Sequence, residues 1–350
     1  MKTITVNASK NYPVHIGHGI LNTICTDLPC LKKAEKAVII SDNNVYPLYG
    51  ETVANALKNA GLDVLSYVFP AGESSKSLST YGAIVNYLAQ NEITRSDILI
   101  ALGGGVVGDI TGFAAATYLR GISFIQVPTT LLAMVDSSVG GKTAIDLDAG
   151  KNLVGAFYQP DMVLCDLDTL STLPDSVFRD GCAEVIKYGV LYDDALFSHL
   201  KNHLLSFDRE YVISRCVELK RNVVMNDEFD TGLRQLLNLG HTIGHSIEKE
   251  SGYQIPHGSA VAIGMAVVTK AAASFGICDK SASDAITAVI SRFGLPTISP
   301  YCADALYQTA LSDKKRTGNT LNLIVPHKIG HCEIHSTPIN KLRSFIEAGL

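Results

Sequence analysis

Apolar runs alternate with amphipathic segments through the first half of the chain. Residues 38–41 and 98–102 are short runs rich in aliphatic and β-branched side chains, which is typical of strands covered on both faces. Helical patterns lie between such runs, so the first half predicts an α/β fold with a largely parallel sheet. Asp42 follows the first run and Gly103 follows the second, and ligands of open α/β sheets bind at such strand ends.

The second half has a different pattern. From about residue 174, apolar residues recur at three- and four-residue intervals over long segments, such as 211–224 and 233–248. This periodicity predicts a mostly α-helical region. One late pair of β-type runs, 321–325 and 331–335, predicts a hairpin within it.

Composition and charge restrict the class of protein. The 350 residues, 47% of them apolar, are enough for two packed domains, and we place the boundary at 1–170 and 171–350. The net charge of −5 shows no basic excess, which argues against nucleic acid as a partner. No stretch resembles a membrane span or a signal peptide, so we expect a soluble, cytoplasmic protein with no membrane partner.

The cysteines indicate neither a disulfide framework nor a zinc cluster. They are scattered without a CxxC pair, and we interpret all of them as structural. The eight positions are Cys25, Cys30, Cys165, Cys182, Cys216, Cys278, Cys302 and Cys332.

A glycine-rich turn follows the second predicted strand. Residues 103–108 read G-x-G-x-x-G and open a predicted helix, a context in which backbone N–H groups hold a pyrophosphate. The acidic residue expected about 20 positions later is missing. Either a dinucleotide binds in a variant arrangement, with Asp42 at its ribose, or the glycines form only a tight turn.

A second glycine pair precedes Lys142. The segment resembles the end of a P-loop, but Asp136 stands where that motif requires glycine, so a nucleoside triphosphatase is disfavoured. Gly140 and Gly141 allow close backbone approach, and Lys142 supplies a charge for a phosphate oxygen. The alternative is a surface loop with a solvated lysine.

Three histidines within 17 positions indicate a metal site. A helix would place His241 and His245 on one face, and His257 follows shortly. The glutamate that follows the first histidine in zincin proteases is absent, so that mechanism is unlikely. Glu184 lies among apolar residues, and a buried carboxylate needs a cation. Mixed nitrogen and oxygen ligands favour zinc or cobalt. The alternative is a helix-capping histidine and a Glu184–Lys187 surface pair.

Seven segments together resemble the 3-dehydroquinate synthase family. The similarity extends from Asp42 to residues 313–315 and implies an NAD-binding α/β domain, a mostly helical metal- and substrate-binding domain, and a homodimer. The segments occur in the family's order, at 103–109, 128–130, 136–143, 150–152, 183–189, 233–245 and 257–258.

The resemblance also implies roles for individual residues. It makes Glu184, His241 and His257 the metal ligands and leaves His245 to transfer protons. Arg120 would reach the phosphate site of the neighbouring subunit. NAD would be bound by Asp42, Glu73, Lys76, Gly104, Gly105, Asp109, Thr129, Thr130, Lys142, Asn152 and Thr172. The substrate would be bound by Asp136, Lys142, Asn152, Lys187, Lys220, Arg234, Asn238 and Lys314.

The activity implied by the family is cyclisation of 3-deoxy-D-arabino-heptulosonate 7-phosphate to 3-dehydroquinate in the shikimate pathway of aromatic amino-acid biosynthesis. NAD would oxidise the C5 hydroxyl, phosphate would leave, and the hydride would return before ring opening and aldol closure. A divalent metal would act as the Lewis acid. The alternatives are a deoxy-inosose or valiolone cyclase, a metal-dependent polyol dehydrogenase and a non-catalytic nucleotide-binding regulator.

Overall fold

The computed structural model describes residues 1–24, 33–311, 316–317 and 319–350. The chain divides into two compact units, one formed by residues 1–173 and 209–229 and the other by 174–208 and 230–350. The boundary expected at residue 170 lies close to residue 173, where the chain first passes from one unit to the other. Residues 209–229 return to the first unit, where α6 (Arg209–Asn226) packs against the first two strands.

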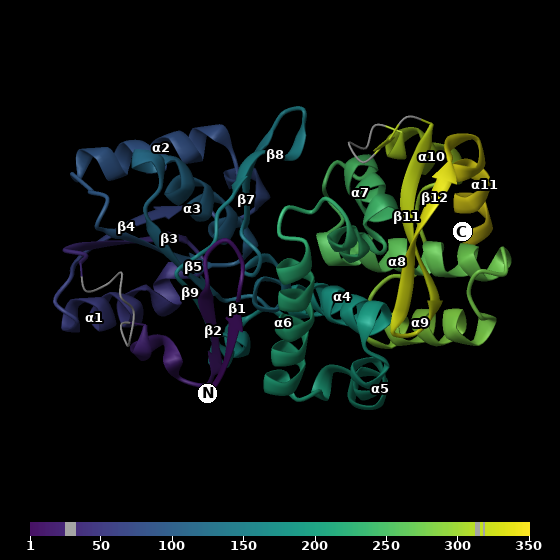
Figure 1. Cartoon of the computed structure of the whole chain (residues 1–350), viewed down its shortest axis with the longest axis horizontal. Helices are drawn as coiled ribbons and strands as arrows, with labels where there is room; N and C mark the ends of the chain where they lie inside the picture. The colour runs from purple at the N-terminus through teal and green to yellow at the C-terminus, as the bar shows by residue number, and fades with distance from the viewer. Residues whose placement is uncertain (25–32, 312–315, 318) are drawn as a thin grey trace. The chain divides into compact units, whose positions relative to one another are not determined.

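The first unit is built on a seven-stranded sheet in the order β1-β2-β9-β6-β5-β3-β4 (Figure 1). Only β1 and β2 are antiparallel neighbours, and all the other pairs are parallel. The strands are β1 (Lys2–Val6), β2 (Tyr12–Gly17), β3 (Lys36–Asp42), β4 (Asp63–Phe69), β5 (Ile98–Gly103), β6 (Ser123–Pro128) and β9 (Met162–Asp166). A separate antiparallel hairpin consists of β7 (Lys142–Leu147) and β8 (Gly150–Phe157).

Helices cover both faces of this sheet. In Figure 1, α2 (Leu78–Gln90) and α3 (Gly105–Thr117) lie above the strands and α1 (Glu51–Asn59) lies below them. Within β3, Ile39 packs in the cluster that includes Leu57 of α1, whereas Ile40 packs in the cluster that includes Ile84 of α2. Because successive residues are buried on opposite faces, the strand is continuously apolar. The predicted α/β fold is confirmed.

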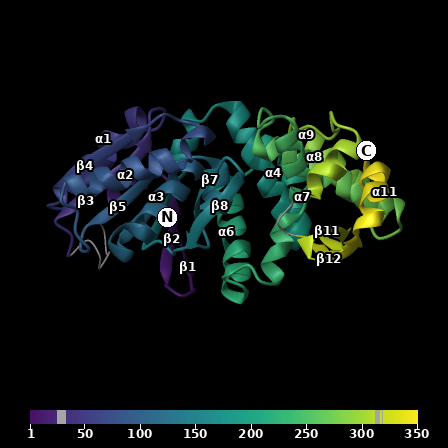
Figure 2. The ribbon, with the colours of Figure 1, turned by 90° about the horizontal axis from the view of Figure 1, so that it is seen from above.

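The second unit is mostly helical, as predicted. In it, β11 (Thr320–Lys328) and β12 (His331–Pro338) form the expected hairpin, and β10 (Arg316–Thr317) extends it to three strands. The helices are α4 (Asp175–Tyr192), α5 (Asp194–His203), α7 (His241–Glu250), α8 (His257–Ser274), α9 (Lys280–Arg292), α10 (Ala303–Ala310) and α11 (Ile339–Gly349), several of which are labelled in Figure 2.

The single helix expected over 233–248 is wrong. Residues Leu233–Asn238 form a short 3-10 helix, η8, and α7 begins only at His241. Gly240 between them has φ +78°, a left-handed conformation that glycine adopts without strain. A Cβ atom there would lie 2.7 Å from the carbonyl oxygen of Val261 in α8. The backbone of α8 therefore lies close to the turn at Gly240, and the apolar periodicity of the sequence does not reveal this turn.

Glycines also set the distance between α7 and α8, which pack against each other. A Cβ on Gly264 would lie 2.0 Å from the backbone oxygen of Gly240. We therefore expect Gly264→Ala to destabilise the protein by about 1–3 kcal/mol in urea unfolding, because overpacking outweighs better helix propensity. As a control, Gly82→Ala in α2 meets no atom within 4 Å and should gain up to about 1 kcal/mol. Wild-type stability of Gly264→Ala would contradict this close crossing.

The cysteines within the described residues form no disulfide, and all of them except Cys302 are buried. Burial raises the pKa of the Cys165, Cys182 and Cys332 thiols, which keeps them protonated and unreactive. Cys25 and Cys30 lie outside the described residues.

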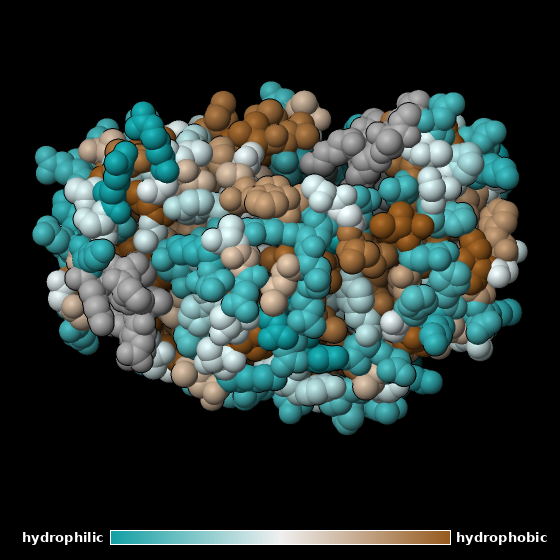
Figure 3. All heavy atoms as spheres, in the orientation of Figure 1, coloured by the Kyte–Doolittle hydropathy of each residue, from teal (hydrophilic) through white to brown (hydrophobic). Residues whose placement is uncertain are grey.

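None of the described helices combines the length and apolar character that a membrane crossing needs. The face drawn in Figure 3 mixes hydrophilic side chains with apolar ones, some of which gather along its upper edge.

Candidate active site

Three helices of the second unit bring Glu184, His241 and His257 together. Nε2 of His241 lies 3.5 Å from Oε1 of Glu184, and Nε2 of His257 lies 3.6 Å from the same oxygen. One ligand atom from each residue lies within 4.8 Å of the other two. Two imidazole nitrogens and one carboxylate oxygen in this arrangement can hold a divalent cation and leave a coordination position open.

The environment of Glu184 fits a cation. Its side chain is 1% exposed, and Oε1 accepts no hydrogen bond of good geometry from any described residue. Lys187, one turn later in α4, is equally buried and forms an ion pair with Oε2. The alternative of a Glu184–Lys187 surface pair is therefore wrong. A buried carboxylate is costly unless a positive charge compensates it, and the two histidines face the oxygen that Lys187 leaves available.

His257 lies between two carboxylates. Its Nε2 faces Glu184, and its Nδ1 lies 3.4 Å from Oε1 of Glu248 in α7. Burial lowers the pKa of His257, but the two carboxylates raise it by more, to about 10. Without a metal the imidazole therefore carries a proton at neutral pH, which a binding cation would displace.

His245 lies one turn after His241 on α7 and is exposed. Its ring centroid is 5.5 Å from that of His241 and 6.2 Å from that of His257. The prediction that a helix stacks the two imidazoles on one face is confirmed. An exposed imidazole beside a candidate metal site is well placed to exchange protons with a bound molecule.

Two further predicted site residues precede α7 in η8. Arg234 is only 2% exposed, and the amide of Asn238 donates a hydrogen bond to the backbone oxygen of Gln235 at 3.0 Å. A guanidinium presents a planar set of donors that matches carboxylates and phosphates. The turn at Gly240 connects these residues directly to the histidine cluster.

A second group of predicted residues meets in the first unit. The ammonium of Lys76 lies 2.5 Å from Oδ2 of Asp109 and 2.5 Å from Oδ1 of Asn152. Burial lowers the pKa of Lys76, but the charges of Asp109, Glu73 and Asp146 raise it by more, so the lysine stays protonated. Segments from η3 (Glu73–Ser75), α3 and β8 thus converge on one buried ammonium group.

Asp146 holds this group together, although sequence reasoning did not identify it. Its carboxylate accepts a hydrogen bond from the backbone N–H of Asn152 at 2.8 Å, and its own N–H donates to the backbone oxygen of Lys76 at 2.7 Å. Asn152 has φ +55°, which is unusual for a residue other than glycine. No motif marks Asp146, and a bridge between Asp146 and Ser77, at an irregularity in the pairing of β7 with β8, places it there.

Asp42 and Gly103 end two neighbouring strands. Ser41 of β3 pairs with Leu102 of β5, and the chain leaves β3 toward β4 but leaves β5 toward β6 on the other side. This divergence makes a topological switch point, where α/β sheets bind ligands. Oδ1 of Asp42 accepts hydrogen bonds from the backbone N–H groups of Asn44 and Val45, both at 2.9 Å. These bonds hold the carboxylate at the end of the strand.

The glycines after β5 lie close to the polar end of β6. A Cβ on Gly104 would lie 3.1 Å from Cγ2 of Thr130, and no side chain in the described part of the chain caps the first turn of α3. Thr129 is 3% exposed, and its hydroxyl forms no hydrogen bond within the described part of the chain. Uncapped N–H groups and a buried unsatisfied hydroxyl at a switch point fit a nucleotide pyrophosphate.

A third contact joins Asp136 and Lys220 in the first unit. The ammonium of Lys220, on α6, donates to the backbone oxygen of Asp136 at 2.5 Å and also contacts its carboxylate. Asp136 lies in the π-helical turn η5 (Ala133–Ser137). The return of α6 to the first unit makes this pair possible.

Four predicted residues remain: Lys142, Arg120, Thr172 and Lys314. Lys142 is exposed at the start of β7, and Arg120 is exposed beyond the C-terminal end of α3. The hydroxyl of Thr172 lies 2.5 Å from that of Tyr49, in the segment that follows Asp42 and β3. Lys314 lies outside the described residues.

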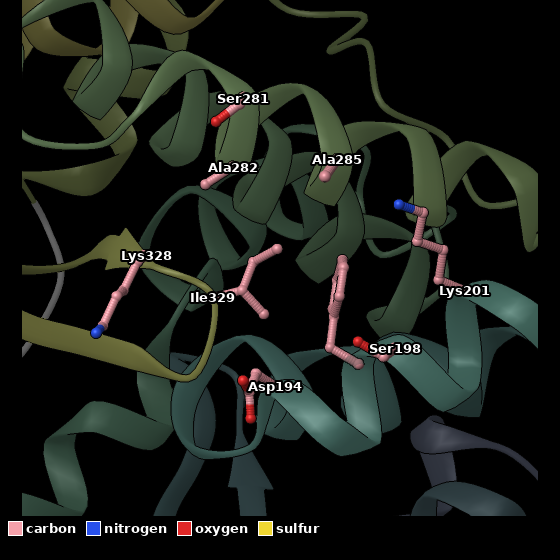
Figure 4. Close-up of a pocket in the computed structure, with 9 residues that line it drawn as sticks. Asp194, Ser198, Lys201, Ser281, Ala282, Ala285, Lys328 and Ile329 are labelled. Carbon is pink, nitrogen blue, oxygen red and sulfur yellow. The ribbon is translucent and has the colours of Figure 1, made fainter.

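A separate hollow in the second unit contains none of the predicted site residues. Asp194, Ser198 and Lys201 of α5 line one part of it, and Ser281 of α9 and Lys328 of β11 line another. The ammonium groups of its two lysines lie at opposite ends (Figure 4). They do not converge on a common point.

Solved structures share this fold over the whole chain. A 2-deoxy-scyllo-inosose synthase, solved with carbaglucose-6-phosphate, NAD+ and Co2+, has a TM-score of 0.90 and 25% identity, with 100% of both chains covered. The 2-epi-5-epi-valiolone synthase of Streptomyces hygroscopicus, with NAD+ and Zn2+ bound, has a TM-score of 0.89 and 25% identity over 99% of this chain and 97% of that one. An iron-containing alcohol dehydrogenase shares only the fold, with a TM-score of 0.69 and 16% identity over 98% of each chain. The fold is therefore that of the sugar-phosphate cyclases.

Sequence comparisons identify the family within that fold. The N-terminal model of 3-dehydroquinate synthase matches residues 66–180, and the C-terminal model matches residues 181–316. The 3-dehydroquinate synthase of Clostridium acetobutylicum is 46% identical over 342 residues, covering 95% of this chain and 96% of that protein. That of Streptococcus suis is 43% identical over 352 residues, covering 98% and 99%. The chain belongs to the 3-dehydroquinate synthase family, and the resemblance found in its sequence is confirmed.

Proposed function

We propose that this chain converts 3-deoxy-D-arabino-heptulosonate 7-phosphate to 3-dehydroquinate and phosphate, as a carbon-oxygen lyase of the shikimate pathway. The convergence of Glu184, His241 and His257 on one point carries the proposal. It provides the centre that a metal-assisted cyclisation needs, in a chain whose relatives with this activity are more than 40% identical over nearly its full length.

The proposed metal is zinc or cobalt, held by Glu184, His241 and His257. When bound, it supplies a positive charge that polarises a substrate oxygen. Lys187 forms an ion pair with the second oxygen of Glu184, so the first oxygen is left to face the proposed cation. His245, exposed one turn from His241, is proposed to accept and return hydroxyl protons, because imidazole titrates near neutral pH.

NAD is proposed to bind at the switch point of the first unit. When bound, it supplies a reversible hydride acceptor for one substrate hydroxyl. The uncapped start of α3, with Gly104 and Gly105, is suited to the pyrophosphate, and Asp42 is suited to a ribose. The buried hydroxyl of Thr129 would gain a hydrogen-bond partner. Thr130 and Thr172 are proposed to bind NAD as well. Lys142 and the group around Lys76, with Glu73, Asp109 and Asn152, complete this assignment.

The substrate is proposed to be bound by its carboxylate and phosphate. Arg234 offers a planar donor set, and the lysines offer point charges. The proposed set comprises Asp136, Lys142, Asn152, Lys187, Lys220, Arg234, Asn238 and Lys314.

We also propose a cytoplasmic homodimer, in which Arg120 of one subunit reaches the phosphate site of the other. The exposure of Arg120 is compatible with that role, and the lack of disulfides among the described cysteines fits a reducing compartment. Light scattering that gives the mass of one chain would contradict the dimer.

The decisive experiment supplies the heptulosonate phosphate to the zinc-loaded protein with a catalytic amount of NAD. We expect equal amounts of phosphate and 3-dehydroquinate with no net absorbance change at 340 nm, because the hydride returns to the substrate. A steady rise at 340 nm with simple polyols would instead indicate a dehydrogenase. Cyclisation of glucose 6-phosphate with no reaction of the heptulosonate would indicate an inosose-type cyclase.

A further inference from the structure

Glu248 is a buried carboxylate next to the proposed metal ligands, and the function proposed above assigns it no role. It lies two turns after His241 on α7, and its side chain is 3% exposed. Its Oε1 is 3.4 Å from Nδ1 of His257, the first residue of α8. The other ring nitrogen of His257 faces Glu184 at 3.6 Å.

A carboxylate beside Nδ1 of His257 affects which ring nitrogen carries the proton. A neutral imidazole has one N–H group and one lone pair, and a metal ligand must present the lone pair to the cation. An acceptor at one nitrogen keeps the proton there, so that the other nitrogen is left to coordinate. A carboxylate at Nδ1 of His257 therefore directs the lone pair of Nε2 toward Glu184.

His241 is held in the same way by a different group. Its Nδ1 lies 3.1 Å from the backbone oxygen of Leu239, while its Nε2 faces the carboxylate of Glu184. Both histidines thus have an oxygen acceptor at Nδ1 and present Nε2 to the same point. The agreement between two residues on different helices argues that the Nδ1 contacts serve the ligand geometry.

We propose that Glu248 is a positioning residue of the metal site, which accepts the Nδ1 proton of His257 and thereby orients Nε2 toward the cation. This inference rests on the metal site of the proposed function. The carboxylate also increases the basicity of the imidazole, which strengthens its bond to a metal.

One ligand atom each from His245, Glu248 and His257 also lies within 4.8 Å of the others. A competing arrangement would place a second cation there, at Nδ1 of His257. If Nε2 held the first cation at the same time, His257 would have to lose both ring protons and bridge two metals. The stoichiometry of zinc binding separates the two possibilities.

The test measures the zinc affinity of the full-length protein by competition with a chromophoric chelator. We expect Glu248→Ala to weaken zinc binding about 10- to 100-fold. Glu248→Gln should weaken it less, because the amide oxygen still accepts the Nδ1 proton. Glu250→Gln is the matched control, since it removes the same charge from an exposed side chain of the same helix. Affinity of both Glu248 variants within twofold of wild type would overturn the proposal.

Nitrogen-15 spectra of zinc-loaded protein with labelled histidine give a second readout that a purely structural role would not alter. We expect His257 to carry its proton on Nδ1 and to coordinate through Nε2. The signal of its Nδ1 proton should broaden or shift in Glu248→Gln but not in Glu250→Gln. Coordination through Nδ1, or binding of two zinc ions per chain with one lost in Glu248→Ala, would overturn the proposal.

The failure of this inference differs from failure of the proposed function. If the wild-type protein neither retains zinc nor forms 3-dehydroquinate, the proposed metal site itself is contradicted. If the wild-type protein retains zinc and forms 3-dehydroquinate, but the Glu248 variants bind zinc as tightly as wild type, only the role of Glu248 is contradicted. If Glu248→Ala does not fold by circular dichroism, Glu248→Gln, which preserves the side-chain volume, carries the comparison.

Discussion

His241→Ala is expected to lose the bound metal, and with it at least about 1,000-fold in turnover. The substitution removes one of the two imidazoles that face Glu184, so its Nε2, 3.5 Å from that carboxylate, is no longer available to a cation. Metal affinity should fall by more than the roughly 100-fold seen when a residue that only hydrogen-bonds to a metal ligand is removed. Loss of several kcal/mol of Lewis-acid stabilisation corresponds to the stated change in rate. Zinc content after gel filtration and phosphate release measure the two effects.

His245→Ala is the matched comparison, because it makes the same change one turn later on the same helix. This variant should retain one zinc per chain but lose roughly 10²- to 10⁴-fold in turnover, the usual contribution of a general acid–base group. Circular dichroism should show that both variants fold. Loss of zinc from His245→Ala and its retention by His241→Ala would reverse the proposed assignment of the two histidines.

Lys76→Met is expected to destabilise the first unit by about 3 kcal/mol and to weaken NAD binding. The ammonium of Lys76 is nearly fully buried and contacts both Asp109 and Asn152, so its removal leaves the Asp109 carboxylate without this positive charge. In a unit of this size the midpoint of thermal unfolding should fall by roughly 6–12 °C. Calorimetric unfolding and an NAD titration measure the two effects.

Two controls separate a lost charge pair from general damage. Asp109→Asn added to Lys76→Met removes the uncompensated charge and should restore part of the stability but not NAD affinity. Lys151→Met alters a more exposed lysine, 3.5 Å from Glu73, and should change stability by less than about 1 kcal/mol. Unchanged stability and NAD affinity in Lys76→Met would contradict a structural or binding role for this ion pair.

Most of the fold was predictable because its signals are local. Continuous apolar runs at 38–41 and 98–102 indicated strands covered on both faces, and the structure packs Ile39 and Ile40 against helices on opposite faces. The late hairpin was likewise apparent from two β-type runs. The break at Gly240 was not, because the apolar spacing continues through it and the nearby backbone of α8 belongs to a distant segment.

For the site, the sequence by itself determined which residue types were present and their spacing along single elements. His241 and His245 are one helical turn apart, and that spacing alone placed both rings on one face. Family resemblance chose the set of candidate ligands, since no spacing rule connects Glu184 with histidines more than 50 positions away.

Only the tertiary structure decided how these groups face one another. It buried the Glu184–Lys187 pair, brought Nε2 of His241 and of His257 to the same oxygen of Glu184, and placed Glu248 next to Nδ1 of His257. It also returned α6 to the first unit, so that Lys220 meets Asp136. These contacts join separate helices and turns, and their geometry depends on packing distances, whereas the periodic patterns in a sequence report only the neighbours within one helix or strand.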